Sequence, residues 1–321
     1  MSCVAEELAA YAERAVAANG GDASARRQDG RTPFHWPPHP ISYEYRLKPV
    51  DWTETASFQA HGETFEVSVA RSPYGVFVRS EALWNEARGD DLEDALYNLR
   101  ETSEPLFERQ LAMARALERP GRFTGHIRDL APLDILKLLY CGDRDVAHEA
   151  RVEIETHAKD KAFFPGLLAI LRDRRHPNRR SAQWCVLDLF EALPLYVPDP
   201  VSEKEAVDAM NALLWDAEDD YARAVYKAGV VLGGHVPYAF GAEALLKSIA
   251  APSRYGRRSA IHGLFHVVEW IPAMRGRVVG ALRDHAREEP DAQLREFAVL
   301  MASDIERGTD HIAEPMFPEE Q

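Results

Sequence analysis

Hydrophobic residues recur at spacings of three and four from about Ala131 to Arg307, which is typical of helices that are buried on one side. The apolar runs come in pairs that are separated by short polar turns. The first helices of these pairs are expected at 133–140, 165–173, 207–216, 241–249 and 277–285. The second helices are expected at 146–154, 179–190, 221–232, 256–268 and 293–305. Residues 126–307 are therefore predicted to be mainly α, with about five helix pairs.

A small residue occupies a corresponding place in each second helix, where it lets a neighbouring helix approach closely. These residues are Ala150, Ala182, Ala224, Ala260 and Ala298. Their spacings of 32, 42, 36 and 38 residues, with two helices per unit, are the signature of an α-solenoid. At the start of one first helix, Ser202 and Glu205 have the spacing of a capping box.

The periodicity changes to two between residues 41 and 80, which indicates a small antiparallel meander. Its strands are expected at Ile41–Leu47, Phe65–Ala70 and Val76–Val78, and its turns at His61-Gly62 and at residues 72–75.

Two helices should follow the meander. One should begin at the cap-like Asp90 and Asp91, and another at Ser103 with Pro105 in its first turn. Residues 41–125 are thus predicted to form a small α/β domain of an antiparallel meander plus helices.

The remaining segments lie at the two ends of the chain. Residues 1–40 should contain a helix followed by a proline-rich linker, and residues 308–321 form an acidic tail. The chain has no run of apolar residues long enough to cross a membrane, and its start lacks the order of a secretory signal. Two of its three cysteines, Cys141 and Cys185, fall in apolar helical runs, where buried free thiols are expected. A cytoplasmic location is therefore predicted.

The helix pairs resemble those of the HEAT-repeat family. In that family an arginine followed three residues later by a small residue opens the second helix. Arg179 with Ala182, Arg257 with Ala260, and Arg295 with Ala298 match this pattern. The resemblance covers a little over half of the chain. It implies a superhelical scaffold in which such arginines join neighbouring repeats.

A candidate binding surface follows from the helical phase of residues 257–269. His262, His266 and Glu269 fall on the side opposite the apolar residues, and Trp184 and Tyr226 are aligned with His262 on the two preceding second helices. Aromatic residues near arginines are typical of protein interfaces. The sequence predicts a non-catalytic adaptor that holds a protein or peptide on the concave face. The predicted contact residues are Arg180, Trp184, Tyr226, Arg258, His262, His266 and Glu269. Packing of Trp184 and Tyr226 against an adjacent repeat or against the amino-terminal domain is the alternative.

Two enzyme hypotheses remain as alternatives. His262 and His266 have the i, i+4 spacing of metal ligands, but the aligned helices supply no further ligands nearby, so no metal or cofactor is expected.

HEAT-like folds also include DNA glycosylases, and arginines surround two turns of this chain. They are Arg174, Arg175, Arg179 and Arg180 at one turn, and Arg254, Arg257 and Arg258 at the other. These arginines could bind anions locally. Acidic residues 216–220 lie between the two groups and the net charge is −14, which disfavours nucleic acid as the partner.

Overall fold

The computed structural model describes residues 52–73, 75–83, 85–158, 162–196, 200–216, 223–236 and 240–308. The chain divides into two compact units, with the boundary at residues 116–125. The expected amino-terminal helix and linker, the expected strand Ile41–Leu47 and the tail after Gly308 lie outside the described residues.

The first unit contains the predicted antiparallel meander. Its strands are β1 (Glu54–Ala60), β2 (Glu63–Ser72), β3 (Gly75–Ser80) and β4 (Asn85–Gly89), and each pairs with the next in chain order. The predicted turn at His61-Gly62 is confirmed, because both residues have positive φ angles of 51° and 77°, as a tight two-residue hairpin requires. β1 and β4 were not singled out individually, because β4 is mostly polar and β1 carries few β-branched residues.

One long helix, α4 (Leu92–Ala116), follows the sheet, so the prediction of two separate helices was wrong. The start was predicted correctly, since Asp91 accepts a hydrogen bond from the Asp94 amide. Pro105 lies inside α4, where its ring removes one helical hydrogen bond. The helix continues because a buried stripe runs past the proline without interruption. Ala95, Leu99, Ser103, Phe107, Gln110 and Met113 form this stripe.

The described residues of the second unit form five helix pairs, as predicted. The first helices are α5 (Pro132–Leu138), α7 (Phe164–Arg172), α9 (Pro200–Trp215), α11 (Phe240–Ser248) and α13 (Arg275–Glu288). The second helices are α6 (Arg144–Thr156), α8 (Arg179–Phe190), α10 (Arg223–Gly234), α12 (Arg254–Trp270) and α14 (Ala292–Arg307). None of the described helices is both long and apolar enough to cross a membrane.

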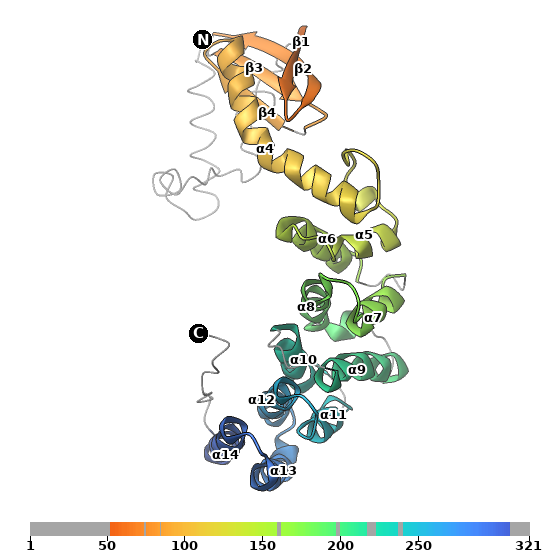
Figure 1. Ribbon diagram of the computed structural model, residues 1–321, viewed down its shortest axis with the longest axis vertical. Helices are drawn as coiled ribbons and strands as arrows, with labels where there is room; N and C mark the ends of the chain where they lie inside the picture. The colour runs from red at the N-terminus through yellow and green to blue at the C-terminus, as the bar shows by residue number, and fades with distance from the viewer. Residues whose placement is uncertain are drawn as a thin grey trace. The chain divides into compact units, whose positions relative to one another are not determined.

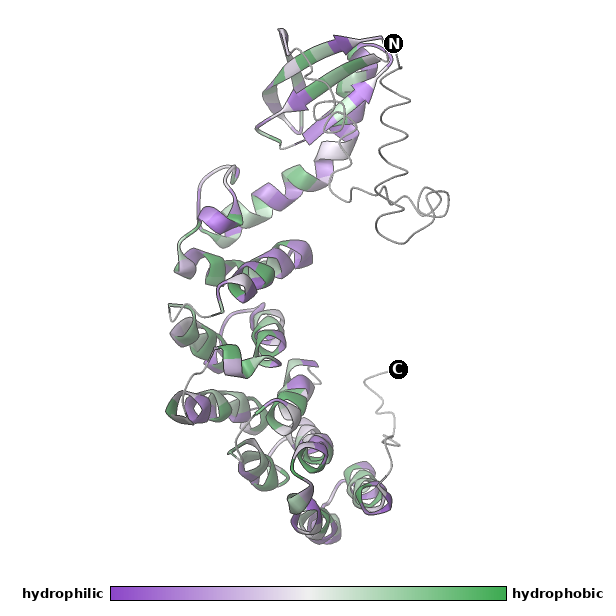
Figure 2. Cartoon of the chain, turned by 180° about the vertical axis from the view of Figure 1, so that it is seen from behind, coloured by the Kyte–Doolittle hydropathy of each residue, from purple (hydrophilic) through white to green (hydrophobic). Residues whose placement is uncertain are grey.

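The first and second helices of this unit form two layers, and the second helices lie on the inner side of the curved stack (Figure 1). The alanines that were aligned in the sequence, Ala150, Ala182, Ala224, Ala260 and Ala298, are all buried. Each helix carries both hydrophobic and hydrophilic residues, as expected for helices that bury one side (Figure 2).

The helix ends follow local capping chemistry at several places. Asp143 and Asp291 accept hydrogen bonds from first-turn amides of α6 and α14, and Gly308 ends α14 in the left-handed conformation. The predicted capping box was wrong. Since α9 already begins at Pro200, Ser202 lies within its first turn and is not the capping residue.

Close packing of α10 against α12 is the tightest contact between second helices. A Cβ added at Gly263 would lie 2.3 Å from the carbonyl oxygen of Gly229, and one added at Gly233 would lie 2.1 Å from that of Gly263. The hydroxyl of Ser259 donates to the Val225 carbonyl at 2.7 Å. Only glycine allows the two backbones to come this close.

The close glycine contact predicts that substitution by alanine has opposite effects on stability at two helical glycines. Gly263→Ala should destabilise the protein by about 1–3 kcal/mol, since its methyl group would meet backbone that has no room to move. Gly280→Ala in α13 is the matched control, because a Cβ there meets no atom within 4 Å. It should stabilise by about 0.5–1 kcal/mol through helix propensity. Chemical unfolding of both variants measures the difference, and equal effects would contradict the packing argument.

Candidate functional site

The candidate site lies on the solvent side of the second helices, opposite the buried alanines. We call this side of α6, α8, α10, α12 and α14 the second-helix face. Trp184, Tyr226 and His262 each lie two residues after the aligned alanine of their helix. Trp184 is 38% exposed, and Tyr226 and His262 are partly buried. All three therefore contribute to the surface without projecting fully into solvent.

A chain of hydrogen bonds connects four of the predicted residues. Tyr226 Oη lies 2.7 Å from His262 Nδ1, and His262 Nε2 lies 3.2 Å from His266 Nε2. His266 Nδ1 in turn lies 2.7 Å from Glu269 Oε2. The guanidinium group of Arg258 lies over the Tyr226 ring, 5.2 Å from its centroid. The structure thus brings five of the seven predicted residues into one cluster between α10 and α12.

One assignment of protons satisfies the whole chain when both histidines are neutral and Glu269 is ionised. His266 then donates from Nδ1 to Glu269 and accepts at Nε2 from His262, which accepts at Nδ1 from the Tyr226 hydroxyl. Burial lowers the pKa of His266 below its usual value, and nearby His262 acts in the same direction against the raising effect of Glu269. The neutral form is therefore favoured near pH 7.

A second cluster joins α6, α8 and α10 through charges. Asp188 Oδ2 of α8 lies 3.0 Å from a guanidinium nitrogen of Arg151 in α6, and its Oδ1 lies 2.5 Å from Lys227 Nζ in α10. Lys227 also lies 3.1 Å from Glu191. Because Asp188 is shared by two cations, three successive repeats are joined by one carboxylate.

Trp184 belongs to this second cluster. The ammonium group of Lys227 lies 4.5 Å from the centroid of the Trp184 ring, within the range of a cation–π interaction. Trp184 and Tyr226 each contact the next second helix, so both pack in part against an adjacent repeat, which was the alternative to a binding role. Each nevertheless keeps part of its surface in solvent.

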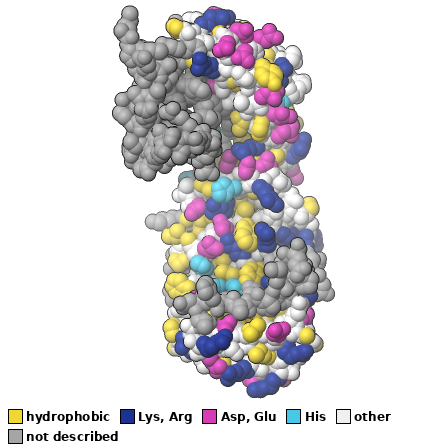
Figure 3. All heavy atoms as spheres, turned by 90° about the vertical axis from the view of Figure 1, so that its left-hand side faces the viewer, with side chains coloured by type: hydrophobic (Ala, Val, Ile, Leu, Met, Phe, Trp, Pro, Cys, Tyr) yellow, Lys and Arg dark blue, Asp and Glu magenta, His cyan; other side chains and the backbone are white. Residues whose placement is uncertain are grey.

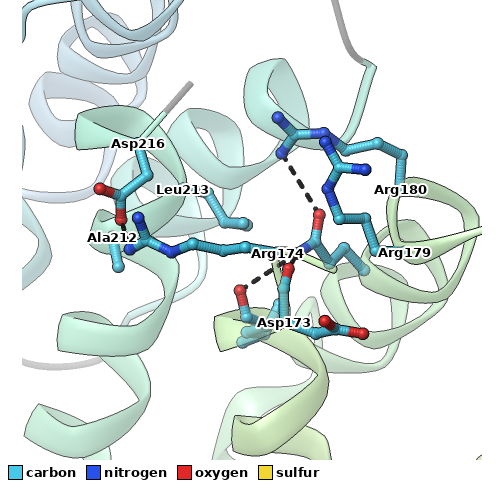
Figure 4. Close-up of a pocket in the computed structure, with 9 residues that line it drawn as sticks. Asp173, Arg174, Arg179, Arg180, Ala212, Leu213 and Asp216 are labelled. Atoms are coloured by element: carbon cyan, nitrogen blue, oxygen red, sulfur yellow. Dashed lines mark hydrogen bonds and ion pairs between the residues drawn. The ribbon is translucent and has the colours of Figure 1, made fainter. Parts of the chain in front are cut away.

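The basic turn between α7 and α8 forms a small pocket with a volume of about 70 Å³. Arg174 reaches from this turn to form an ion pair with Asp216 at the end of α9 (Figure 4). Arg180 donates to Gln183, and the buried amide of Gln183 donates to the carbonyl of Asp173 at 2.9 Å. Arg180 therefore lies in this pocket rather than in the cluster of Tyr226 and the histidines.

The second basic turn is also tied to carboxylates of the neighbouring repeat. Arg257 makes two hydrogen bonds of 2.8 and 3.0 Å to the fully buried carboxylate of Glu289. Arg254 lies 3.1 Å from Asp291, and Arg295 donates to the Glu289 carbonyl. Arg254 and Arg257 thus join the fourth helix pair to the fifth, as the family resemblance implied for Arg257. Arg295 and Glu289 both belong to the fifth pair, so the contact of Arg295 lies within one repeat.

Neither alternative enzyme hypothesis gains support from the described residues. They contain no group of three or more His, Cys, Asp or Glu side chains that could hold a metal ion. Basic and acidic side chains are interspersed over the visible part of the second-helix face (Figure 3). A nucleic-acid surface would present a continuous basic stripe.

Two residues of this face were missed in the sequence. Lys227 lies in a helix of mostly apolar and small residues, and its partners on α8 are about 40 positions earlier in the chain. Trp270 is 69% exposed and follows His262 and His266 at the same four-residue spacing. That spacing is a signal that could have placed Trp270 on the face.

The ion pairs of the arginines predict that removing a buried pair costs more stability than removing an exposed one. Arg257→Ala should cost about 3–5 kcal/mol of unfolding free energy, because it leaves the Glu289 carboxylate buried without its main partner. Arg283→Ala breaks the exposed pair with Glu306 and should cost less than about 1 kcal/mol. Urea denaturation of both variants tests this. A small cost for Arg257→Ala would mean that this arginine is not structural.

The histidine chain predicts a dependence of stability on pH. His266 has a lower pKa in the folded than in the unfolded state, so the unfolded state binds protons more readily and stability falls as pH drops below about 6.5. The His266→Gln variant should lose less stability than the wild type between about pH 7.5 and pH 5.5. Partly buried His285, whose pKa is also lowered, remains in both proteins and contributes equally. Identical pH profiles would rule out a titrating role for His266.

Comparison of the chain with protein-family models, curated proteins and solved structures finds no match. The HEAT-repeat resemblance therefore stays a prediction, and the functional argument rests on the geometry of the second-helix face.

Proposed function

We propose that this protein is a non-catalytic scaffold of the HEAT-repeat type, which holds a protein or peptide partner on the second-helix face. The observation that carries the proposal is the row formed by Trp184, Tyr226 and His262. These residues occupy equivalent places on three adjacent second helices, and a group from a neighbouring repeat holds each of them while part of its surface stays in solvent.

Fixed aromatic groups favour binding for a physical reason. A side chain that is already held in one orientation loses little conformational entropy when a partner docks. Trp184 is held by Lys227, and Tyr226 is held by His262. The Tyr226 ring also packs against the guanidinium group of Arg258, which is buried. Aromatic residues in such settings are the usual energetic centres of interfaces.

The double variant Trp184→Ala with Tyr226→Ala tests the proposal. It should weaken binding of the native partner by about 2 kcal/mol or more, because both aromatic anchors are removed. Stability should fall by only about 1–3 kcal/mol, since both side chains are partly exposed. Partner recovery from the native host, followed by affinity measurement with purified components well below the melting temperature, separates the two effects.

Trp215→Ala provides the matched control. Trp215 is 42% exposed and donates to the Ser248 hydroxyl at 2.8 Å, but it lies at the end of α9 in the layer of first helices. Its truncation should leave partner affinity unchanged. Undiminished partner affinity of the double variant, measured well below its melting temperature, would refute binding at the second-helix face.

A further inference from the structure

The second helices run parallel to one another, so their carboxyl-terminal turns lie along one edge of the second-helix face. Contacts between α10 and α12 advance in the same direction along both helices: Ser259 bonds Val225, Gly263 lies against Gly229, and Trp270 lies against Gly234. Likewise, Lys227 of α10 meets Asp188 near the end of α8, and His235, directly after α10, meets Glu191, directly after α8. Helix carboxyl termini carry partial negative charge, and a row of them favours cations.

At the end of α14 the cation is the exposed member of the ion pair, since Arg307 is 64% exposed against 4% for Asp304. Around the ends of α8 and α12, and in the Arg151–Glu155 pair of α6, the carboxylate is the more exposed member. The Lys227 side chain is 9% exposed, whereas its partner Glu191 is 43% exposed. Arg151 is 18% exposed against 56% for Glu155. Glu269 is 49% exposed and is paired with the less exposed His266. A molecule that approaches the ends of α8 and α12 therefore meets the carboxylates of Glu191 and Glu269 before it meets their partners Lys227 and His266.

Two tryptophans accompany these carboxylates. Trp270 directly follows Glu269 at the end of α12, is 69% exposed, and lies beside the end of α10, where a Cβ on Gly234 would be 3.5 Å from its indole nitrogen. Trp184 precedes Asp188 by one turn of α8 and already holds a lysine over its ring. We define the acidic edge as Trp184, Asp188, Glu191, Glu269 and Trp270.

We infer that the acidic edge binds a cationic segment of a partner protein, one that carries lysine or arginine side chains. The inference rests on the proposed function and specifies the chemistry of the partner. A lysine or arginine at the end of α12 would meet the Trp270 ring and the Glu269 carboxylate together, as Lys227 meets Trp184 and Glu191 within the chain. The net charge of −14 adds long-range attraction for such a segment. The same charges oppose acidic peptides and nucleic acid.

The test uses three short fluorescein-labelled peptides in which glycine alternates with lysine, glutamine or glutamate. Fluorescence anisotropy with the full chain should show the lysine peptide binding at least about fivefold more tightly than the glutamine peptide, and more weakly as ionic strength rises. The glutamate peptide should not bind measurably. Equal affinity for the lysine and glutamine peptides would overturn the inference.

Isosteric variants locate the binding. Glu191→Gln combined with Glu269→Gln should weaken lysine-peptide binding about fivefold, and Trp270→Ala about threefold. Glu243→Gln is the matched control, because this glutamate is 45% exposed and paired with Arg277, but lies on α11 in the layer of first helices. If Glu243→Gln weakens binding as much as the double variant, attraction by net charge alone explains it and the acidic edge is refuted.

The same variants separate this inference from the proposed function. If Trp184→Ala with Tyr226→Ala abolishes capture of the native partner but Glu191→Gln with Glu269→Gln leaves it unchanged, the proposed scaffold function is supported and the preference for a cationic segment is refuted. If both sets of variants capture the partner as fully as the wild type below their melting temperatures, both proposals fail.

Discussion

The close contact between α10 and α12 determines the chemistry of the second-helix face. Gly229, Gly233 and Gly263 bring the two backbones together, and Ser259 bonds across them. At this separation a tyrosine and a histidine, which are short and rigid, reach each other directly, as the 2.7 Å contact of Tyr226 with His262 shows. Between α8 and α10 the connection is made instead by the long side chain of Lys227. Helix spacing therefore selects which side chains can join neighbouring repeats.

The helix pairs were predictable because their signals are local. A period of 3.6 residues, short polar turns and one small residue per second helix were enough to place five pairs, with ends correct to within a few residues for most helices. The errors came from local signals that tertiary burial overrode. Pro105 and Ser103 resemble a helix start, but the continuous buried stripe of α4 carries the helix through them.

The candidate site was predictable only in part, for a related reason. Helical phase alone places Tyr226, His262 and His266 on one side, and the structure finds them connected. The ion pairs of Lys227 with Asp188 and of Arg257 with Glu289 depend on how far apart neighbouring helices lie and how they are oriented. Periodicity contains no such information, so these partners emerge only from the structure.

The distribution of charge on this face has a physical origin that bears on binding. Arg151 and Lys227 bury their long stems along the helices and bring their charges to the carboxylates of Glu155 and Glu191, which remain nearer to solvent. A carboxylate at a helix carboxyl terminus is unfavourable for the helix by about 0.3–1 kcal/mol, unless a cation compensates it. Lys227 provides that compensation at the end of α8.

At the end of α12 the partner of Glu269 is His266, whose pKa is lowered by burial, so the imidazole is mostly neutral near pH 7. The negative charge is thus least compensated beside the most exposed tryptophan of the face, and a cation from outside has most to gain there.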